Sequence, residues 1–243
     1  MWIALALCLI CAVLLALALH SRAEHAKPAS KDPEGAIAAQ EDEDRTVDVP
    51  VDFAAWQERN PDIYAWIEYP GTNVDYPIVQ SAEDDAYYLR RDIDGKEAVA
   101  GSLYTEHTYN SKTFDDPVTV IYGHNMANRT MFGGLQSHIE AADLASTEEY
   151  FYVYLPGRIL TYRVVGGAPG DDAHILYYND FSDPTGFSNY FGNLYAQSGG
   201  HVNLPGLLRP SPDDRVVILA TCMNGEKYLR YLIIGVLTDD TGN

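Results

Sequence analysis

Short runs of apolar and alternating residues, separated by turn residues, fill most of the chain after residue 60. Runs of this length are typical of β-strands. Turn sequences such as Pro70-Gly71-Thr72-Asn73 and Pro156-Gly157 divide them. The pattern predicts eight strands, at 64–69, 74–80, 101–105, 118–123, 150–155, 158–165, 215–221 and 228–237.

Two segments have helical patterns instead. Asp52 can cap a short helix that carries Phe53 and Trp56 and stops at Asn60-Pro61. A longer helix is predicted from Asp183 to Ser198, with Pro184 at its first position and one apolar stripe. The stripe consists of Phe187, Tyr190, Phe191, Leu194 and Tyr195. The whole pattern predicts a mainly β fold, a single mixed barrel with an N-terminal helix and a helix between strands six and seven.

The N-terminus has a different composition. Residues 2–19 are 18 apolar residues without a charge, which is near the lower limit for a membrane-spanning helix. We expect an uncleaved anchor at 1–20, with a cleaved signal peptide as the alternative. The cations Arg22, Lys27 and Lys31 follow the run and disagree with this orientation under the positive-inside rule. We expect an acidic, flexible stalk at 21–48 and a catalytic domain at 49–243.

The net charge argues against one class of partner, and the aromatic content supports the predicted strands. The formal net charge is −19, which argues against nucleic acid as a partner, because such binding requires Lys and Arg to neutralise phosphates. Aromatic residues make up 12 % of the chain, including 18 Tyr. Their abundance favours β-strands, where aromatic side chains fit the half-buried pleated surface.

The chain has three cysteines, and two of them, Cys8 and Cys11, lie in the apolar N-terminal run. Cys222 is therefore the only cysteine of the expected domain, and it has no disulfide partner there. Such a thiol is either a buried small residue or a reactive group. Cysteine and histidine spacings give no support for a metal site.

Three residues with reactive or charged side chains lie at the ends of apolar strands or within them. His124 directly follows the strand at 118–123, and Cys222 ends the strand at 215–221. Arg230 lies inside the last apolar strand, an unusual position for a fixed charge. Each alone has a plain structural explanation, such as a capped histidine or an edge arginine with a packed stem.

Together the three residues supply the components of acyl transfer. Cys222 would be the nucleophile as a thiolate, which a nearby cation stabilises. His124 would move protons as general acid and base. Arg230 would hold an oxyanion or a carbonyl oxygen, because guanidinium stays charged and presents a rigid set of donors. The sequence contains no GxSxG motif, which disfavours a serine hydrolase.

At these residues the chain resembles the sortases, cysteine transpeptidases of Gram-positive cell surfaces. Leu219-Ala220-Thr221-Cys222 matches the sortase motif Thr-Leu-x-Thr-Cys except that Ile218 replaces its leading Thr. Tyr122-Gly123-His124 and Arg230 match the surroundings of the family histidine and arginine. The resemblance is greatest to class B, whose opening is similar to the segments 60–62, 66–67, 72–80 and 84–89 and whose inserted helix corresponds to 183–198. Asp85 departs from the family pattern, in which an Asn is usual.

The resemblance implies an eight-stranded sortase barrel and a specific reaction. The nucleophile would cleave a C-terminal sorting signal after Thr through a thioacyl-enzyme and pass the surface protein to a peptidoglycan amine, without a cofactor or metal. Leu89, Tyr122 and Thr221 would line the substrate groove. The implied partners are proteins with a sorting signal, the peptidoglycan precursor amine and the membrane. The implied localisation is the cell membrane, single-pass, with the catalytic domain on the extracytoplasmic face.

Three alternatives remain open at this point. A pilin-polymerising sortase would use a Lys side chain as the acceptor, and such enzymes usually carry a lid, for which Asp32-Pro33 is a weak candidate. A non-catalytic, membrane-tethered binding module would keep the fold without the activity. A plain cysteine peptidase would resolve the thioester with water in place of an amine.

Overall fold

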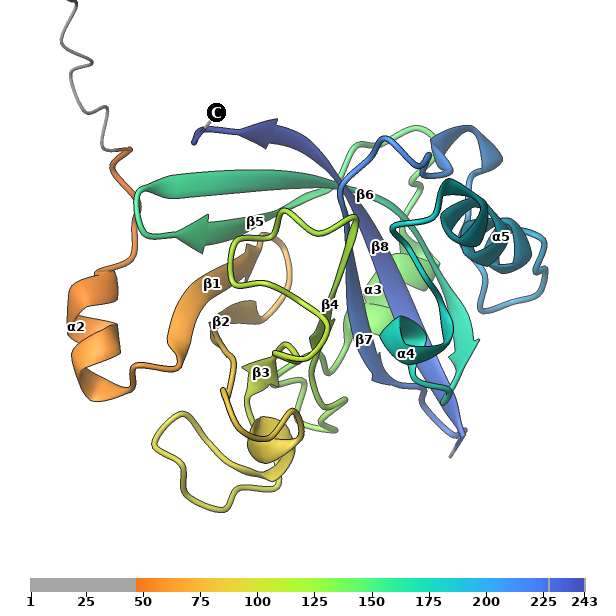
Figure 1. Ribbon diagram of the computed structural model, residues 1–243. Coiled ribbons are helices and arrows are strands. Elements are labelled where there is room, and N and C mark those ends of the chain that lie inside the picture. Colours follow the sequence, from red (N-terminus) through yellow and green to blue (C-terminus); the bar gives the residue numbers. More distant parts are fainter. Residues whose placement is uncertain (1–46, 227, 243) are drawn as a thin grey trace, which may run out of the picture. The chain divides into compact units, whose positions relative to one another are not determined.

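Eight strands form a closed barrel in the computed structural model, which describes residues 47–226 and 228–242. The strands are β1 (Ile63–Tyr69), β2 (Val74–Val79), β3 (Leu103–Tyr104), β4 (Val118–Tyr122), β5 (Tyr150–Leu155), β6 (Arg158–Asp171), β7 (Val216–Cys222) and β8 (Leu229–Asp240). Their order around the barrel is β1-β2-β3-β4-β7-β8-β6-β5 (Figure 1). The pairs β2–β3 and β4–β7 are parallel, and the other neighbours are antiparallel. The predicted eight-stranded, mainly β barrel is confirmed.

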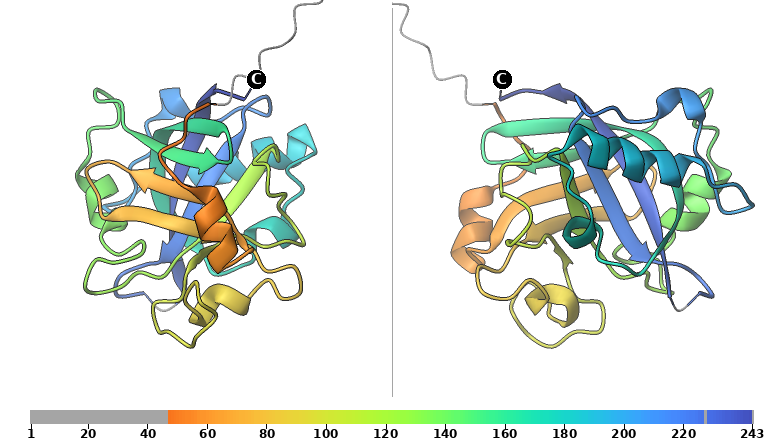
Figure 2. Two further views of the ribbon diagram at one scale, coloured as in Figure 1. Left: turned by 90° about the vertical axis from the view of Figure 1, so that its left-hand side faces the viewer. Right: turned by 45° about the vertical axis from the view of Figure 1, so that its right-hand side comes forward.

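Helices occupy the connections between strands. They are α2 (Phe53–Arg59), η1 (Tyr87–Arg90), α3 (Leu135–Ala141), α4 (Ile175–Tyr178), α5 (Pro184–Tyr195) and η2 (Gly206–Leu208). Both predicted helices are present: α2 precedes the barrel, and α5 lies between β6 and β7. Asp52 accepts a hydrogen bond from the Ala55 amide, and Asp183 accepts from the first amides of α5. Helices α2 and α5 lie on opposite sides of the barrel in Figure 1, and the right-hand view of Figure 2 shows α5 in front of the blue C-terminal strands.

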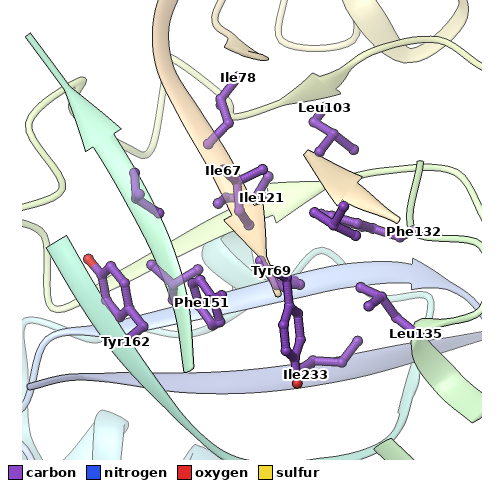
Figure 3. Packing of buried hydrophobic residues seen from close by; sticks show 14 of the residues in the cluster. Ile67, Tyr69, Ile78, Leu103, Ile121, Phe132, Leu135, Phe151, Tyr162 and Ile233 are labelled. Carbon is purple, nitrogen blue, oxygen red and sulfur yellow. The ribbon is translucent and has the colours of Figure 1, made fainter. Parts of the chain in front are cut away.

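The barrel interior is the main hydrophobic core. Large side chains from strands far apart in the sequence fill it, together with side chains of α3 and the loop before it (Figure 3). They include Ile67, Tyr69, Ile78, Leu103, Ile121, Phe132, Leu135, Phe151, Tyr162 and Ile233. Burial of this much apolar surface fixes the strands rigidly, so the side chains at their ends have little freedom of position.

A second apolar cluster covers the outside of β4, β7 and β8. Phe187, Phe191 and Leu194 of α5 pack there against Val120 and Ile218. Because alternate residues of a strand point to opposite faces, Val120 meets α5 while Ile121 enters the barrel. Strand β4 is therefore buried on both faces, as its continuous apolar sequence predicts.

Strand β6 is longer than predicted, since it continues past residue 165 to Asp171. The extension contains Gly166-Gly167, and glycine is unfavourable inside a strand. These glycines pair with Ile234 and Ile233 of β8. A Cβ at Gly166 would lie 2.6 Å from a methyl carbon of Leu204, so the absence of side chains allows a neighbouring loop to pack directly on the strand.

The predicted single-pass membrane localisation is corrected by the structure. Within residues 47–226 and 228–242, no helix is long and apolar enough to cross a membrane. The longest helix of this part is α5, with 12 residues, whereas a bilayer core of about 30 Å requires about 20 apolar residues. The segment predicted as the anchor, 1–20, and nearly all of the predicted stalk, 21–48, lie outside the described residues.

Candidate active site

Cys222 and Arg230 lie directly opposite each other on neighbouring antiparallel strands. Cys222 is the last residue of β7 and is exposed, whereas the six residues before it are buried. Directly opposed residues point to the same face of a sheet. The guanidinium Nη1 of Arg230 accordingly lies 3.6 Å from the thiol Sγ. A guanidinium at this distance can donate a hydrogen bond to the sulfur.

His124 reaches the same rim of the barrel because β4 runs parallel to β7. The two strands are in register up to Tyr122 and Ala220, two residues before His124 and Cys222 respectively. The imidazole Nε2 lies 2.7 Å from the carbonyl oxygen of Leu89. Since a carbonyl only accepts, Nε2 carries the proton, and Nδ1 is the ring nitrogen that can accept one. Within the described residues no hydrogen bond joins His124 to Cys222.

A hollow of about 230 Å³ surrounds these groups. All six residues predicted from the sequence for catalysis or substrate binding line it. They are Leu89, Tyr122, His124, Thr221, Cys222 and Arg230, and the remaining lining residues are Tyr104, Glu106, Gly123, Asp172, Ala173, His174, Ile175 and Ala220. The fold therefore brings the predicted constellation to one place.

Two tyrosine rings, a buried threonine and an exposed leucine line part of the hollow. The rings of Tyr104 and Tyr122 stack with centroids 5.4 Å apart. Burial, and then the charge of Glu106, raise the pKa values of both phenols, so the hydroxyls stay neutral. Thr221 is buried, and its hydroxyl has no hydrogen-bond partner among the described residues. Leu89, in contrast, is exposed at the opening of the hollow.

Asp85, which departs from the family pattern, does not line the hollow. Its carboxylate binds Nδ1 of His107 at 2.6 Å and the amide of Thr108 at 3.2 Å. Burial acts to raise the pKa of Asp85, but the Thr108 hydrogen bonds and the nearby His107 outweigh it, and the pKa is lowered. Asp85 thus holds a loop beside the hollow.

Asn125 is a residue of this site that sequence reasoning missed. Its amide Nδ2 donates to the carbonyl oxygen of Cys222 at 2.8 Å and to Oδ1 of Asn224 at 2.9 Å. The loop after β4 is thereby tied to the end of β7. The only signal in the sequence is that Asn125 directly follows His124.

Among residues 47–226 and 228–242, no three His, Cys, Asp or Glu side chains are close enough to bind one ion together. The groups that line the hollow include a thiol, an imidazole and a guanidinium.

Comparison with known proteins identifies the family. Sortase B of Listeria monocytogenes is 30 % identical over 174 residues, which cover 71 % of this chain and 67 % of the relative. The chain belongs to the sortase family, class B. It is by this membership a sortase-type cysteine transpeptidase. Sortase B of Staphylococcus aureus is 28 % identical over 88 residues, covering 36 % of this chain and 35 % of that protein.

Solved sortase structures have the same architecture. A mutant form of Clostridium perfringens sortase B matches with a TM-score of 0.65 at 24 % identity, covering 77 % of this chain and 86 % of that chain. Sortase B of Bacillus anthracis in complex with AAEK1 matches with a TM-score of 0.63 at 25 % identity, covering 77 % and 84 %. No family model matches the chain. The structural matches confirm the sortase-type barrel with its inserted helix.

Proposed function

We propose that Cys222, His124 and Arg230 are the catalytic residues of this sortase. The proposed reaction cleaves a C-terminal sorting signal after Thr and transfers the protein to a peptidoglycan amine. The observation that supports it most directly is the 3.6 Å approach of the Arg230 guanidinium to the Cys222 thiol, at the rim of a hollow that also contains His124.

In the first half of the reaction, the Cys222 thiolate attacks the carbonyl carbon of the Thr residue. A C–S bond forms, and the carbonyl oxygen becomes an oxyanion. The oxyanion then re-forms the carbonyl as the C–N peptide bond breaks, and His124 gives the leaving amine the proton that its Nδ1 took from the Cys222 thiol. The products of this half are a thioacyl-enzyme and the released C-terminal tail.

In the second half, the acceptor amine attacks the thioacyl carbon. A C–N bond forms, the C–S bond breaks, and the electron pair returns to Cys222 as a thiolate. His124 accepts the proton that the attacking amine loses. Each cycle thus restores both side chains without an external oxidant, reductant or cofactor.

Arg230 would act where negative charge develops. Its guanidinium is charged at every working pH, so it can stabilise the thiolate before attack and the oxyanion after it. Leu89, Tyr122 and Thr221 would contact the peptide, because they line the hollow that contains the thiol. Leu89 offers exposed apolar surface, whereas Tyr122 is partly buried and Thr221 is buried. Residues 49–243 would form the catalytic domain.

The test is a mass-spectrometric incubation of the full chain with peptides of the NPxTN, NPxTG and LPxTG types, with and without a glycine-peptide amine. The proposal predicts cleavage after Thr, a thioacyl adduct on Cys222 and an amide product when the amine is present. Proteolytic mapping separates an adduct on Cys222 from one on Cys8 or Cys11. Cys222→Ala, His124→Ala and Arg230→Ala should each abolish transfer while the circular-dichroism spectrum is kept.

Other results would change the assignment. An adduct that only water resolves, whatever amine is supplied, would indicate a cysteine peptidase. A Cys222 that reacts with iodoacetamide but forms no adduct with these peptides would contradict the proposed signal. A Cys222 that does not react even with iodoacetamide would contradict its role as the nucleophile and favour a non-catalytic module.

A further inference from the structure

A buried carboxylate lies in the wall of the hollow, near the proposed catalytic residues but outside the proposed chemistry. Glu106 follows β3, and only 9 % of the residue is exposed. Its Oε1 lies 3.1 Å from Nε2 of His174, whereas Oε2 has no hydrogen-bond partner among the described residues. Burial raises the pKa of Glu106, although the adjacent His174 and an interaction with the Tyr122 hydroxyl act in the opposite direction. Such a group is costly to retain in a wall that apolar residues could fill.

His174 uses both ring nitrogens in fixed contacts. It is the N-cap residue of α4, and its Nδ1 accepts a hydrogen bond from the Tyr177 amide at 3.1 Å. Because Nδ1 accepts, Nε2 carries a proton and donates a hydrogen bond to the Glu106 carboxylate. Protonation at Nδ1 would break the contact with Tyr177. The ring also packs against Tyr109, with centroids 4.7 Å apart.

The bond joins two parts of the chain that are 68 residues apart in sequence. His174 belongs to the segment 172–175, which follows β6 and lines the hollow around Cys222. Residues 173–175 also line a second hollow of about 360 Å³, whose other side consists largely of α5. This segment is thus a thin wall between two hollows, and the described hydrogen bonds anchor it to the β3 side of the barrel through Glu106.

Among the described residues, few other contacts hold the 172–175 wall in place. Ala173 is exposed, and its amide donates a hydrogen bond to the carboxylate of Asp171, the last residue of β6. Asp172 is exposed as well, and Ile175 contributes apolar packing against the barrel. The position of the wall relative to Tyr122 and Thr221 therefore depends on the length and direction of the Glu106–His174 bond.

We propose that Glu106 and His174 are a positioning pair that holds the 172–175 wall of the hollow in the conformation that receives the sorting peptide. The inference rests on the proposed function, since it assigns the wall to the same peptide. Neither residue takes part in bond making. The pair sets how well the peptide binds, so its loss raises KM and leaves kcat nearly unchanged.

Three substitutions in the full chain separate the pair from general stability. His174→Asn keeps a side chain that can cap α4 but is too short to reach Glu106. Glu106→Leu removes the acceptor and keeps the volume. Glu106→Gln retains an acceptor oxygen for a neutral imidazole N–H and should restore most of the binding.

The first measurement is steady-state kinetics with the peptide that forms an adduct on wild-type Cys222. The second is the affinity of the same peptide, fluorescently labelled, for each variant combined with Cys222→Ala. We expect His174→Asn and Glu106→Leu to raise KM and the dissociation constant about tenfold, with kcat within about twofold of wild type and Glu106→Gln close to wild type. The iodoacetamide reaction rate of Cys222 should not change. His201→Ala is the matched control, because His201 forms an exposed pair with Glu140 at 2.7 Å and does not line the hollow.

The outcomes distinguish this proposal from the proposed function. Unchanged KM and affinity in folded His174→Asn and Glu106→Leu, with wild type active, would overturn the positioning role alone. A fall in kcat at constant KM would overturn it too, since it would give the pair a part in the chemistry. If Glu106→Leu does not fold, His174→Asn still decides, because it leaves the carboxylate in place. A wild-type chain that neither forms an adduct nor binds any of the peptides would overturn both proposals.

Discussion

Cys222 and Arg230 face each other across the β7–β8 ladder, and Nη1 of the guanidinium lies 3.6 Å from Sγ of the thiol. The backbone register sets this distance, because each residue belongs to a strand buried in the barrel. A slip of one residue would turn Arg230 to the opposite face of the sheet. The relationship therefore depends on the hydrophobic pattern of both strands as much as on the two residues themselves.

This geometry predicts that the charge and the shape of Arg230 are both required. Arg230→Ala should lower kcat/KM by at least about 100-fold, the usual cost of removing one donor to an oxyanion. Arg230→Lys should recover part of the activity, since it keeps the charge but loses the rigid set of donors. Peptide-transfer assays measure both values. Arg59→Ala is the control, because Arg59 forms an exposed ion pair with Asp94, and near-normal activity in Arg230→Ala would remove the guanidinium from the mechanism.

Asn125 should affect catalysis through the position of the loop that carries His124. Asn125→Ala removes the hydrogen bonds to the Cys222 carbonyl and to Asn224. We expect kcat to fall about tenfold, while KM changes little, because small displacements of a catalytic group are costly. Asn73→Ala is a suitable control, since that amide bonds only the Arg129 carbonyl. An unchanged kcat for Asn125→Ala would show that the loop holds its position without this link.

Much of the site could be predicted because its residues follow strongly apolar strands. The runs 118–122 and 216–221 are recognisable as buried strands, so His124 and Cys222 are recognisable as residues at strand ends. Their common rim follows from the parallel pairing of β4 and β7. Sequence periodicity does not determine which strands pair, and here the family resemblance supplied the arrangement.

Other features could not be predicted because only tertiary contacts determine them. Glu106 and His174 meet across 68 residues of chain, and nothing near either residue indicates the other. Helix α3 begins after Gly134, which has a φ of 95° and provides no side-chain cap, so the usual start signal is missing. The extension of β6 through Gly166-Gly167 depends on neighbouring side chains that occupy the space of the missing Cβ atoms.

Gly123, directly before His124, should not tolerate a methyl group. A Cβ there would lie 2.4 Å from Cδ2 of Leu103 and 2.6 Å from Cδ2 of Phe132, and both side chains are fully buried. Gly123→Ala should lower the free energy of unfolding by about 1–3 kcal/mol, as overpacking usually does, and should reduce kcat by displacing His124. Urea denaturation and transfer kinetics test the two effects. Gly206→Ala is the control, because nothing lies within 4 Å of that Cβ position, and equal stability of the two variants would contradict the prediction.

Asp240 should make the barrel sensitive to acid. Its carboxylate lies 2.7 Å from Nη2 of Arg158 and 2.7 Å from Nη2 of Arg215, and only 7 % of its side chain is exposed. Hydrogen bonds from Arg158 hold the pKa of Asp240 well below its usual value, and they outweigh the opposing effect of burial. Hydrogen bonds from Arg215 lower the pKa further. Because the folded-state pKa is depressed, the unfolded chain binds the proton more readily. The stabilisation is therefore complete above the unfolded pKa of about 4 and decreases as pH falls below it.

Asp240→Asn should accordingly lower the free energy of unfolding at pH 7 by about 2–3 kcal/mol, because it removes the buried carboxylate that two partly buried guanidinium groups share and leaves them only the exposed one of Asp115. The difference between wild type and variant should narrow as pH falls from 5 to 3, which urea denaturation at each pH can follow. Asp115→Asn is the matched control: Asp115 contacts the same two arginines, but 55 % of its side chain is exposed, so its loss should cost at most about 1 kcal/mol. A difference that stays constant with pH would show that Asp240 stabilises the barrel through packing or neutral hydrogen bonds, since only the ionised carboxylate loses its advantage on protonation.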